Sequence, residues 1–249
     1  MAEDVTFRVF RGEPDSEGTP VGQMVDYTVE MDEGMVVLDV VHRIQAEHSP
    51  DLACRWNCKA GKCGSCSAEV NGHSKLMCMD RLDNYEPGKT IAVRPMKTFP
   101  VIKDIVCDVS WNFKQNKQIG QLQPRLDTDW LFTQREADRV QEFRKCIECF
   151  LCQNVCHVLR DHDRKDDFVG PRFLVRLASL EMHPIDAGDR LEQIKDDYGI
   201  GYCNITKCCT EVCPESITIT DNAIIPLKER LADRYYDPLA WIRNKLTGR

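Results

Sequence analysis

The sequence lacks long apolar runs and the common nucleotide-binding motifs. Spanning a bilayer takes roughly 20 apolar residues, whereas the run Met35–Val41 is short and interrupted by Asp39. The 249 residues contain no Gly-rich dinucleotide fingerprint, no P-loop and no HExxH pair, so no motif indicates two-electron substrate chemistry on this chain. If the protein works at a membrane, we expect another chain to hold it there.

Basic residues are also scarce. The chain has 33 Lys and Arg against 40 Asp and Glu, a net charge of −7, and no basic stripe. This balance argues against nucleic acid as a partner. The start, Met1–Asp4, lacks the features of a secretory signal or a mitochondrial transit peptide. We therefore expect a cytoplasmic bacterial protein whose thiols stay reduced unless a metal binds them.

Apolar periodicity divides the chain near residue 104. In the first part, alternation predicts a mixed α+β domain over residues 1–104. Its expected elements are strands around 5–9 and 25–29, a helix over 36–45, a hairpin over 68–77 that turns at Asn71-Gly72, and a strand over 90–93.

After residue 104, helical spacing dominates, and we predict an all-α domain over 105–249. Residues 112–129 form a polar stretch with few apolar anchors. The expected helices cover 102–109, 134–144, 171–182, 191–198, 223–232 and 238–246.

The chain has 14 cysteines, and the first group is compact. Its C-x4-C-x2-C…C spacing is that of plant-type 2Fe–2S proteins. Gly61 and Gly64 allow the loop to turn and bring backbone N–H groups near the sulfurs. A structural zinc site is the alternative, but zinc ribbons pair two separate C-x2-C knuckles. The spacing assigns the 2Fe–2S ligands as Cys58, Cys63, Cys66 and Cys78.

Two further groups repeat a ferredoxin pattern. The second is a C-x2-C-x2-C-x3-C run, in which the fourth cysteine serves the other of two clusters. The third reads C-x2-T-x2-C-x3-C-P on the same template. Crossed ligation assigns Cys146, Cys149, Cys152 and Cys213 to a 4Fe–4S cluster and leaves Cys156, Cys203 and Cys209 for the other.

Thr206 stands where the third group would have its second cysteine. Three thiolates cannot hold four corners of a cubane, so we expect a 3Fe–4S cluster with its open corner at Thr206. Cys54, Cys107 and Cys208 remain outside the ligand sets. Cys107 is expected in the core, and Cys208 is either a thiol beside a ligand or itself in contact with iron.

Three clusters of different types in one chain indicate a relay for single electrons. The sequence also resembles the iron–sulfur subunits of succinate dehydrogenase and fumarate reductase, the succinate:quinone oxidoreductase family. Beyond the cysteines, the resemblance rests on Cys63–Cys66 with the Asn71-Gly72 turn, on Thr98–Asp104 and on Gly170-Pro171. It covers roughly residues 5 to 235.

The family implies an N-terminal β-grasp, plant-type ferredoxin-like domain and an all-α ferredoxin-type domain. It implies a succinate dehydrogenase of the tricarboxylic acid cycle and respiratory chain, with this subunit peripheral on the cytoplasmic face of the bacterial inner membrane. A flavoprotein with FAD would deliver electrons, and a membrane anchor with haem b would hold the quinone. Two alternatives remain: a quinol:fumarate reductase working in reverse, or a subunit of another dehydrogenase, such as one linked to thiols.

Three positions depart from the family pattern. His157 replaces the proline after Cys156, Leu159–Asp161 replaces tryptophans, and Asn204 replaces a histidine. These changes suggest a subtype that uses a lower-potential quinone. His157 is a possible quinone-side contact, or else a histidine that packs against the cluster or donates to a sulfur.

Overall fold

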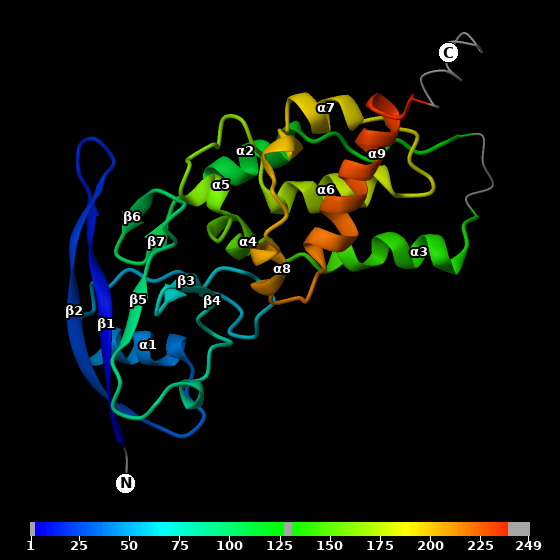
Figure 1. The fold of residues 1–249 in the computed structure, drawn as a ribbon. Helices are drawn as coiled ribbons and strands as arrows, with labels where there is room; N and C mark the ends of the chain where they lie inside the picture. Colours follow the sequence, from blue (N-terminus) through cyan, green and yellow to red (C-terminus); the bar gives the residue numbers. More distant parts are fainter. Residues whose placement is uncertain (1–2, 127–130, 239–249) are drawn as a thin grey trace. The chain divides into compact units, whose positions relative to one another are not determined.

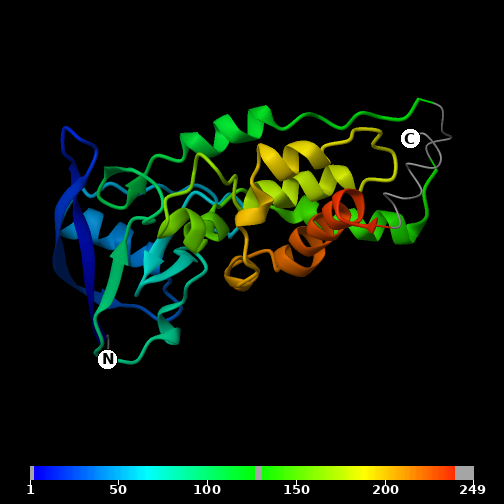
Figure 2. The same cartoon turned by 45° about the horizontal axis from the view of Figure 1, so that its top comes forward.

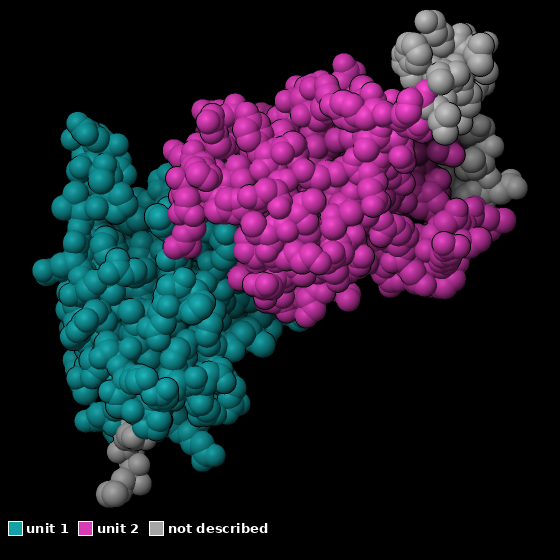
Figure 3. Space-filling model, viewed as in Figure 1, with its two compact units in different colours: residues 1–113, 147–155 teal, residues 114–146, 156–249 magenta. Residues whose placement is uncertain are grey.

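A computed structural model describes residues 3–126 and 131–238 of the chain. The chain divides into two compact units, coloured separately in Figure 3. Unit 1 comprises residues 1–113 and 147–155, and unit 2 comprises 114–146 and 156–249. The predicted domain boundary at residue 104 therefore differs from this division. Unit 1 continues to residue 113 and also includes residues 147–155.

Unit 1 is built on a five-stranded sheet with the strand order β2-β1-β5-β3-β4 (Figure 1). β1 and β5 are parallel, and the other neighbours are antiparallel. The strands are β1 (Glu3–Pro14), β2 (Pro20–Met31), β3 (Ser67–Val70), β4 (His73–Leu76) and β5 (Ile91–Arg94). The predicted strands and hairpin are confirmed.

Alternation in the strands and helical spacing in α1 (Val37–Glu47) supply the core of unit 1. Phe7 and Val9 of β1 are fully buried, and so is the apolar stripe of α1, as expected for a helix that covers a sheet. The Asp39 carboxylate caps this helix by accepting a hydrogen bond from the Val36 N–H at 3.2 Å. The predicted helix over 36–45 is confirmed.

The predicted helix over 102–109 is wrong. The segment is instead a short hairpin of β6 (Val101–Lys103) and β7 (Val106–Cys107). Its apolar residues have helical spacing, but Asp104 between the strands takes a left-handed conformation with φ 49°. That conformation ends a helix and turns the chain.

The side chain of Asp104 explains why the turn forms. It is 2 % exposed and accepts hydrogen bonds from the Gly12 N–H at 2.9 Å and the Ala53 N–H at 2.8 Å. The Arg11 guanidinium pairs with it at 3.1 Å. A buried carboxylate needs such partners. Here they come from segments far away in the sequence, so the spacing of apolar residues around Asp104 could not predict them.

Over its described residues, unit 2 consists of helices joined by irregular segments. Its α-helices include α3 (Gln134–Gln141), α5 (His157–Arg160), α6 (Pro171–Glu181), α7 (Leu191–Asp196), α8 (Cys208–Glu211) and α9 (Ile225–Tyr235). There, strand pairing amounts to one isolated bridge between Pro124 and Asp186. The helices predicted over 134–144, 171–182, 191–198 and 223–232 are found with shifted ends, and residues 239–246 of the last predicted helix lie outside the described residues.

Four α-helices appear where none was predicted: the short α5 and α8, and two more. α2 (Ser110–Gln118) occupies part of the polar stretch, and α4 (Leu151–Asn154) is a single turn in unit 1. Neither has a long apolar stripe that periodicity could reveal. No helix in the described ranges is long and apolar enough to cross a bilayer.

The core of unit 2 centres on α6. Pro171 opens this helix, as proline does at a first turn, and Leu174 and Leu177 are fully buried. α6 packs against the π turn Ile219–Ile224, which continues into α9, and α7 lies against α9 (Figure 2).

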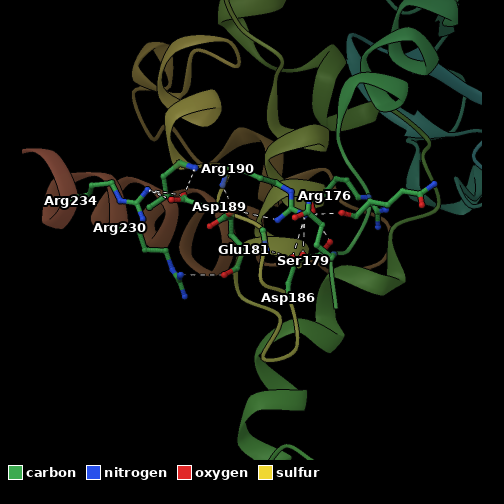
Figure 4. Close-up of polar contacts among 12 residues, drawn as sticks. Arg176, Ser179, Glu181, Asp186, Asp189, Arg190, Arg230 and Arg234 are labelled. Carbon is green, nitrogen blue, oxygen red and sulfur yellow. Dashed lines mark hydrogen bonds and ion pairs between the residues drawn. The ribbon is translucent and has the colours of Figure 1, made fainter. Parts of the chain in front are cut away.

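A buried arginine ties the loop after α6 to that helix. Arg190 pairs with Glu181 at 3.5 Å and with Asp186 at 3.1 Å, and all three side chains are buried (Figure 4). It also donates to the carbonyl of Gln121 at 2.8 Å. At the surface, Asp189 and Arg234 of α9 are joined at 2.6 Å. These contacts join the segment between α6 and α7 to α6 and to α9.

Candidate iron–sulfur sites

The first cysteine loop gathers its four thiols within unit 1. Cys63 is hydrogen-bonded with Cys58, and Cys66 with Cys78. The backbone N–H groups of residues 60 and 62 point at the Cys58 sulfur from 3.4 and 3.3 Å. Such N–H···S contacts stabilise a thiolate and help to set the potential of a cluster. The predicted 2Fe–2S ligands are thus brought together.

The surroundings of these thiols differ. Burial works against ionisation of Cys63, but hydrogen bonds from Ser65 and Cys58 outweigh it and lower the pKa of Cys63 to about 6. Burial raises the pKa of Cys66 to about 12. The Cys63 thiol therefore ionises more easily than the Cys66 thiol, which would have to lose its proton to bind a metal.

Two glycines shape the loop, as expected. Gly61 and Gly64 have φ +68° and +69°, in the left-handed region that favours glycine. A Cβ on Gly61 would meet the flexible Met79 side chain at 2.8 Å. A Cβ on Gly64 would lie 2.6 Å from Cys149 Cα. The loop backbone therefore touches the backbone of the second cysteine motif.

Hydrogen bonds hold the segment 147–155 within unit 1. The Ser67 hydroxyl contacts the carbonyl oxygens of Gly64 and Cys149, each at 2.9 Å. Asn154 is fully buried: its side-chain oxygen accepts from the Thr98 N–H at 3.0 Å, and its amide donates to Glu69 at 2.8 Å. This arrangement keeps part of the second motif against the first loop.

The cysteines assigned to the 4Fe–4S cluster belong two to each unit. Cys149 and Cys152 are buried in unit 1. In unit 2, Cys146 lies close enough to Cys213 to affect it electrostatically. The Cys213 sulfur accepts a hydrogen bond from the Ile217 N–H at 3.4 Å, and burial raises the pKa of Cys213. The pair in unit 1 is buried, and in the pair of unit 2 the half-buried Cys213 has a backbone N–H donor, as cluster ligands do.

The second and third motifs repeat the same backbone. In the second, the neighbours of Cys149 are left-handed, with φ 55° at Glu148 and 61° at Phe150. In the third, the neighbours of Thr206 are left-handed, with φ 62° and 64°. A four-residue helix, α4 or α8, then begins two residues after Cys149 or Thr206. The local backbone thus gives Thr206 the position that Cys149 has in the second motif.

A small thiol-lined cavity of about 20 Å³ lies in unit 2, and we call it the Cys203 cavity. It is lined by the three predicted ligands Cys156, Cys203 and Cys209, and also by Thr206, His157 and Cys208. Burial raises the pKa of Cys156 to about 12 and that of Cys209 to about 11.

These thiols fit a multinuclear cluster, which needs several sulfurs around a space. In the described ranges, no three His, Cys, Asp or Glu side chains are placed around a single metal ion. Sequence reasoning left the position of Cys208 open, and its proximity to Thr206 depends on the left-handed backbone of the loop. The remaining cysteines lie in unit 1, where Cys107 is buried on β7 and Cys54 is half-buried.

A sheet domain with a plant-type cysteine loop, followed by paired ferredoxin motifs, defines the class of iron–sulfur electron-transfer proteins. Two family models agree: "2Fe-2S iron-sulfur cluster binding domain" matches residues 6–114, and "4Fe-4S dicluster domain" matches 142–217.

Similarity over nearly the whole chain gives the particular family. The chain is 30 % identical over 230 residues to the fumarate reductase iron-sulfur subunit of Mycobacterium tuberculosis, covering 87 % of this chain and 89 % of that one. It is 26 % identical over 235 residues to the succinate dehydrogenase iron-sulfur subunit of Paracoccus denitrificans, with 92 % and 88 % covered.

A chain of the Mycobacterium smegmatis Sdh1 complex in the apo form matches with a TM-score of 0.91 and 56 % identity, over 96 % of this chain and all of that one. This chain belongs to the family of iron–sulfur subunits of succinate dehydrogenase and fumarate reductase. The family expected from the sequence is confirmed.

The two loop glycines provide a matched test of the contact with Cys149. Both substitutions to alanine strain a left-handed residue, but only Gly64→Ala also places a methyl group against backbone atoms. We expect Gly64→Ala to cost ~3 kcal/mol of stability and Gly61→Ala ~1 kcal/mol. Gly64→Ala should also lose most of the EPR signal of the reduced 2Fe–2S cluster. Equal effects of the two variants on the unfolding midpoint and on this signal would contradict the proposed contact.

Proposed function

We propose that this chain is the electron-transfer subunit of a membrane-bound succinate:quinone oxidoreductase. In this proposal, single electrons pass from FAD through the 2Fe–2S, 4Fe–4S and 3Fe–4S clusters to a quinone. The observation that carries the proposal is the Cys203 cavity, where three cysteines and Thr206 surround one space. A threonine at the corner that a fourth cysteine would occupy is the chemical basis for a trinuclear last cluster.

The chain's own residues bind the clusters and tune them. Bound clusters would supply one-electron redox chemistry, and their potentials depend on hydrogen bonds, charge and burial. N–H groups act on Cys58 and Cys213, and the Thr220 hydroxyl lies 3.5 Å from the Cys209 sulfur. The contact of Gly64 with Cys149 favours passage from the first cluster to the second. The proposed electron relay requires no substrate-binding site on this chain.

The proposal needs two kinds of partner. A flavoprotein with FAD would carry the succinate and fumarate site. One or more membrane anchor subunits, with haem b, would hold the quinone next to the last cluster. The complex would lie on the cytoplasmic face of the bacterial inner membrane, in the respiratory chain and the tricarboxylic acid cycle.

The 30 % identity with a fumarate reductase subunit is also consistent with a second candidate, a quinol:fumarate reductase. Both reactions use the same relay in opposite directions. The direction is set by the quinone pool and the partner chains.

Purification of the complex from native membranes tests the proposal. We expect a flavoprotein and an anchor chain to copurify, with succinate-dependent quinone reduction faster than quinol-dependent fumarate reduction. A faster reverse reaction would favour the second candidate. A complex without either activity would contradict both.

His157 is proposed as a quinone-side residue, because it lines the Cys203 cavity and opens α5. We expect His157→Ala to slow quinone reduction about tenfold while electron transfer to an artificial dye stays unchanged. His162, with its ring 6.3 Å from that of His157, provides the control variant His162→Ala. Unchanged quinone reduction in His157→Ala with intact clusters would remove this residue from the proposal.

Thr206→Cys tests the identity of the last cluster. A thiol at this position completes the four-cysteine template, so we expect a cubane and loss of the EPR signal of the oxidised trinuclear cluster. Thr206→Ser keeps a hydroxyl and should retain that signal. The trinuclear assignment would be wrong if the unsubstituted protein lacked the signal.

A further inference from the structure

Four cysteines, rather than three, line the Cys203 cavity. Cys208 shares this lining with Cys156, Cys203 and Cys209. Electrostatic interaction with Cys208 contributes to the raised pKa of both Cys156 and Cys209, so the three side chains lie near one another. A trinuclear cluster uses only three of these thiols. The fourth has no role in the electron relay described above.

Cys208 lies beside the proposed open corner. Its sulfur is 3.4 Å from the Thr206 hydroxyl oxygen. It is also the first residue of α8. The left-handed conformation of the preceding residue, Lys207, therefore sets the position of the Cys208 Cα. At its counterpart in the second motif, Leu151 is almost fully buried, whereas Cys208 is partly exposed. The position therefore combines a metal-binding side chain, access from solvent and proximity to the corner.

The loop around Thr206 is held from two sides. The Lys207 ammonium is bound to Asp221 at 2.8 Å, and the Lys228 ammonium donates to the carbonyl of Cys203 at 2.7 Å. The two left-handed residues that flank Thr206 need this support, because each costs about 1–3 kcal/mol. Such a frame allows the Cys208 side chain to turn about its own bonds while the three other ligands stay in place.

We propose that Cys208 supplies a fourth thiolate, so that the Cys203 cavity can take up a fourth iron and become a 4Fe–4S site. This rests on the proposed trinuclear cluster. One electron first reduces the cluster from [3Fe–4S]⁺ to [3Fe–4S]⁰, and Fe²⁺ then adds to give [4Fe–4S]²⁺ without further electron transfer. One Fe–S bond forms to Cys208, and its thiol proton leaves to solvent. The electron comes from the relay itself or from added dithionite.

Iron uptake by the purified complex tests this proposal. The anaerobic complex is reduced with dithionite, incubated with ⁵⁷Fe²⁺, desalted and examined by Mössbauer and EPR spectroscopy. We expect the unsubstituted complex to take up one ⁵⁷Fe per chain and to lose the trinuclear EPR signal on reoxidation. Cys208→Ala should take up at least about tenfold less, because the fourth ligand is missing. Thr206→Ala keeps the thiol and should still take up iron.

The outcomes separate this inference from the function on which it rests. A trinuclear EPR signal with equal ⁵⁷Fe uptake by the unsubstituted and Cys208→Ala complexes would overturn the role of Cys208 and leave the relay intact. If Thr206→Ala lost the uptake of ⁵⁷Fe while Cys208→Ala kept it, the Thr206 hydroxyl would be the ligand. That result would also overturn the role of Cys208. No trinuclear signal in any untreated complex would instead overturn the proposed cluster set.

A second measurement avoids substitution, in case Cys208→Ala does not fold. Native alkylation followed by peptide mass spectrometry reports which thiols react with the reagent. We expect Cys208 to be alkylated before iron loading and protected after it. Equal alkylation before and after loading, in protein that has taken up ⁵⁷Fe, would contradict the proposal.

Discussion

The need for several thiolates to converge on iron constrains this structure more than any other interaction. A buried thiol resists ionisation, as the raised pKa values of Cys66, Cys156 and Cys209 show. Metal binding supplies the energy that removes the proton, so a cluster and the fold around it stabilise each other. The left-handed residues and N–H donors of the loops are the local means by which the chain brings the sulfurs together.

Around these loops, ordinary packing provides a rigid frame. In unit 1, the buried Asp104 and Asn154 each join segments that are far apart in sequence. In unit 2, Arg190 does the same between two carboxylates and a carbonyl. Breaking a buried charged pair of this kind costs about 3–5 kcal/mol. A relay benefits from such rigidity, because its ligands need to keep fixed positions while electrons pass.

Much of this arrangement could be predicted from the sequence, for physical reasons. Alternation identified β1 and β2, a helical stripe identified α1 and α6, and the Asn71-Gly72 pair identified the hairpin. Cysteine spacing identified the loops, because the short intervals within each motif bring several thiols to one turn of the chain. The hairpin at Asp104 was missed, because its cause is hydrogen bonding with residues 12 and 53. The place of Cys208 in the Cys203 cavity also depends on loop conformation, which spacing alone does not determine.

The central claim is that one chain holds three clusters of different type as a conductor for single electrons. The most direct measurement is an EPR redox titration of the anaerobically purified native complex, together with its iron and zinc content. The account predicts three signals from this subunit, from a 2Fe–2S, a 4Fe–4S and a 3Fe–4S cluster, each with its own midpoint potential. Zinc without iron, or two cubane clusters with no trinuclear signal, would contradict it.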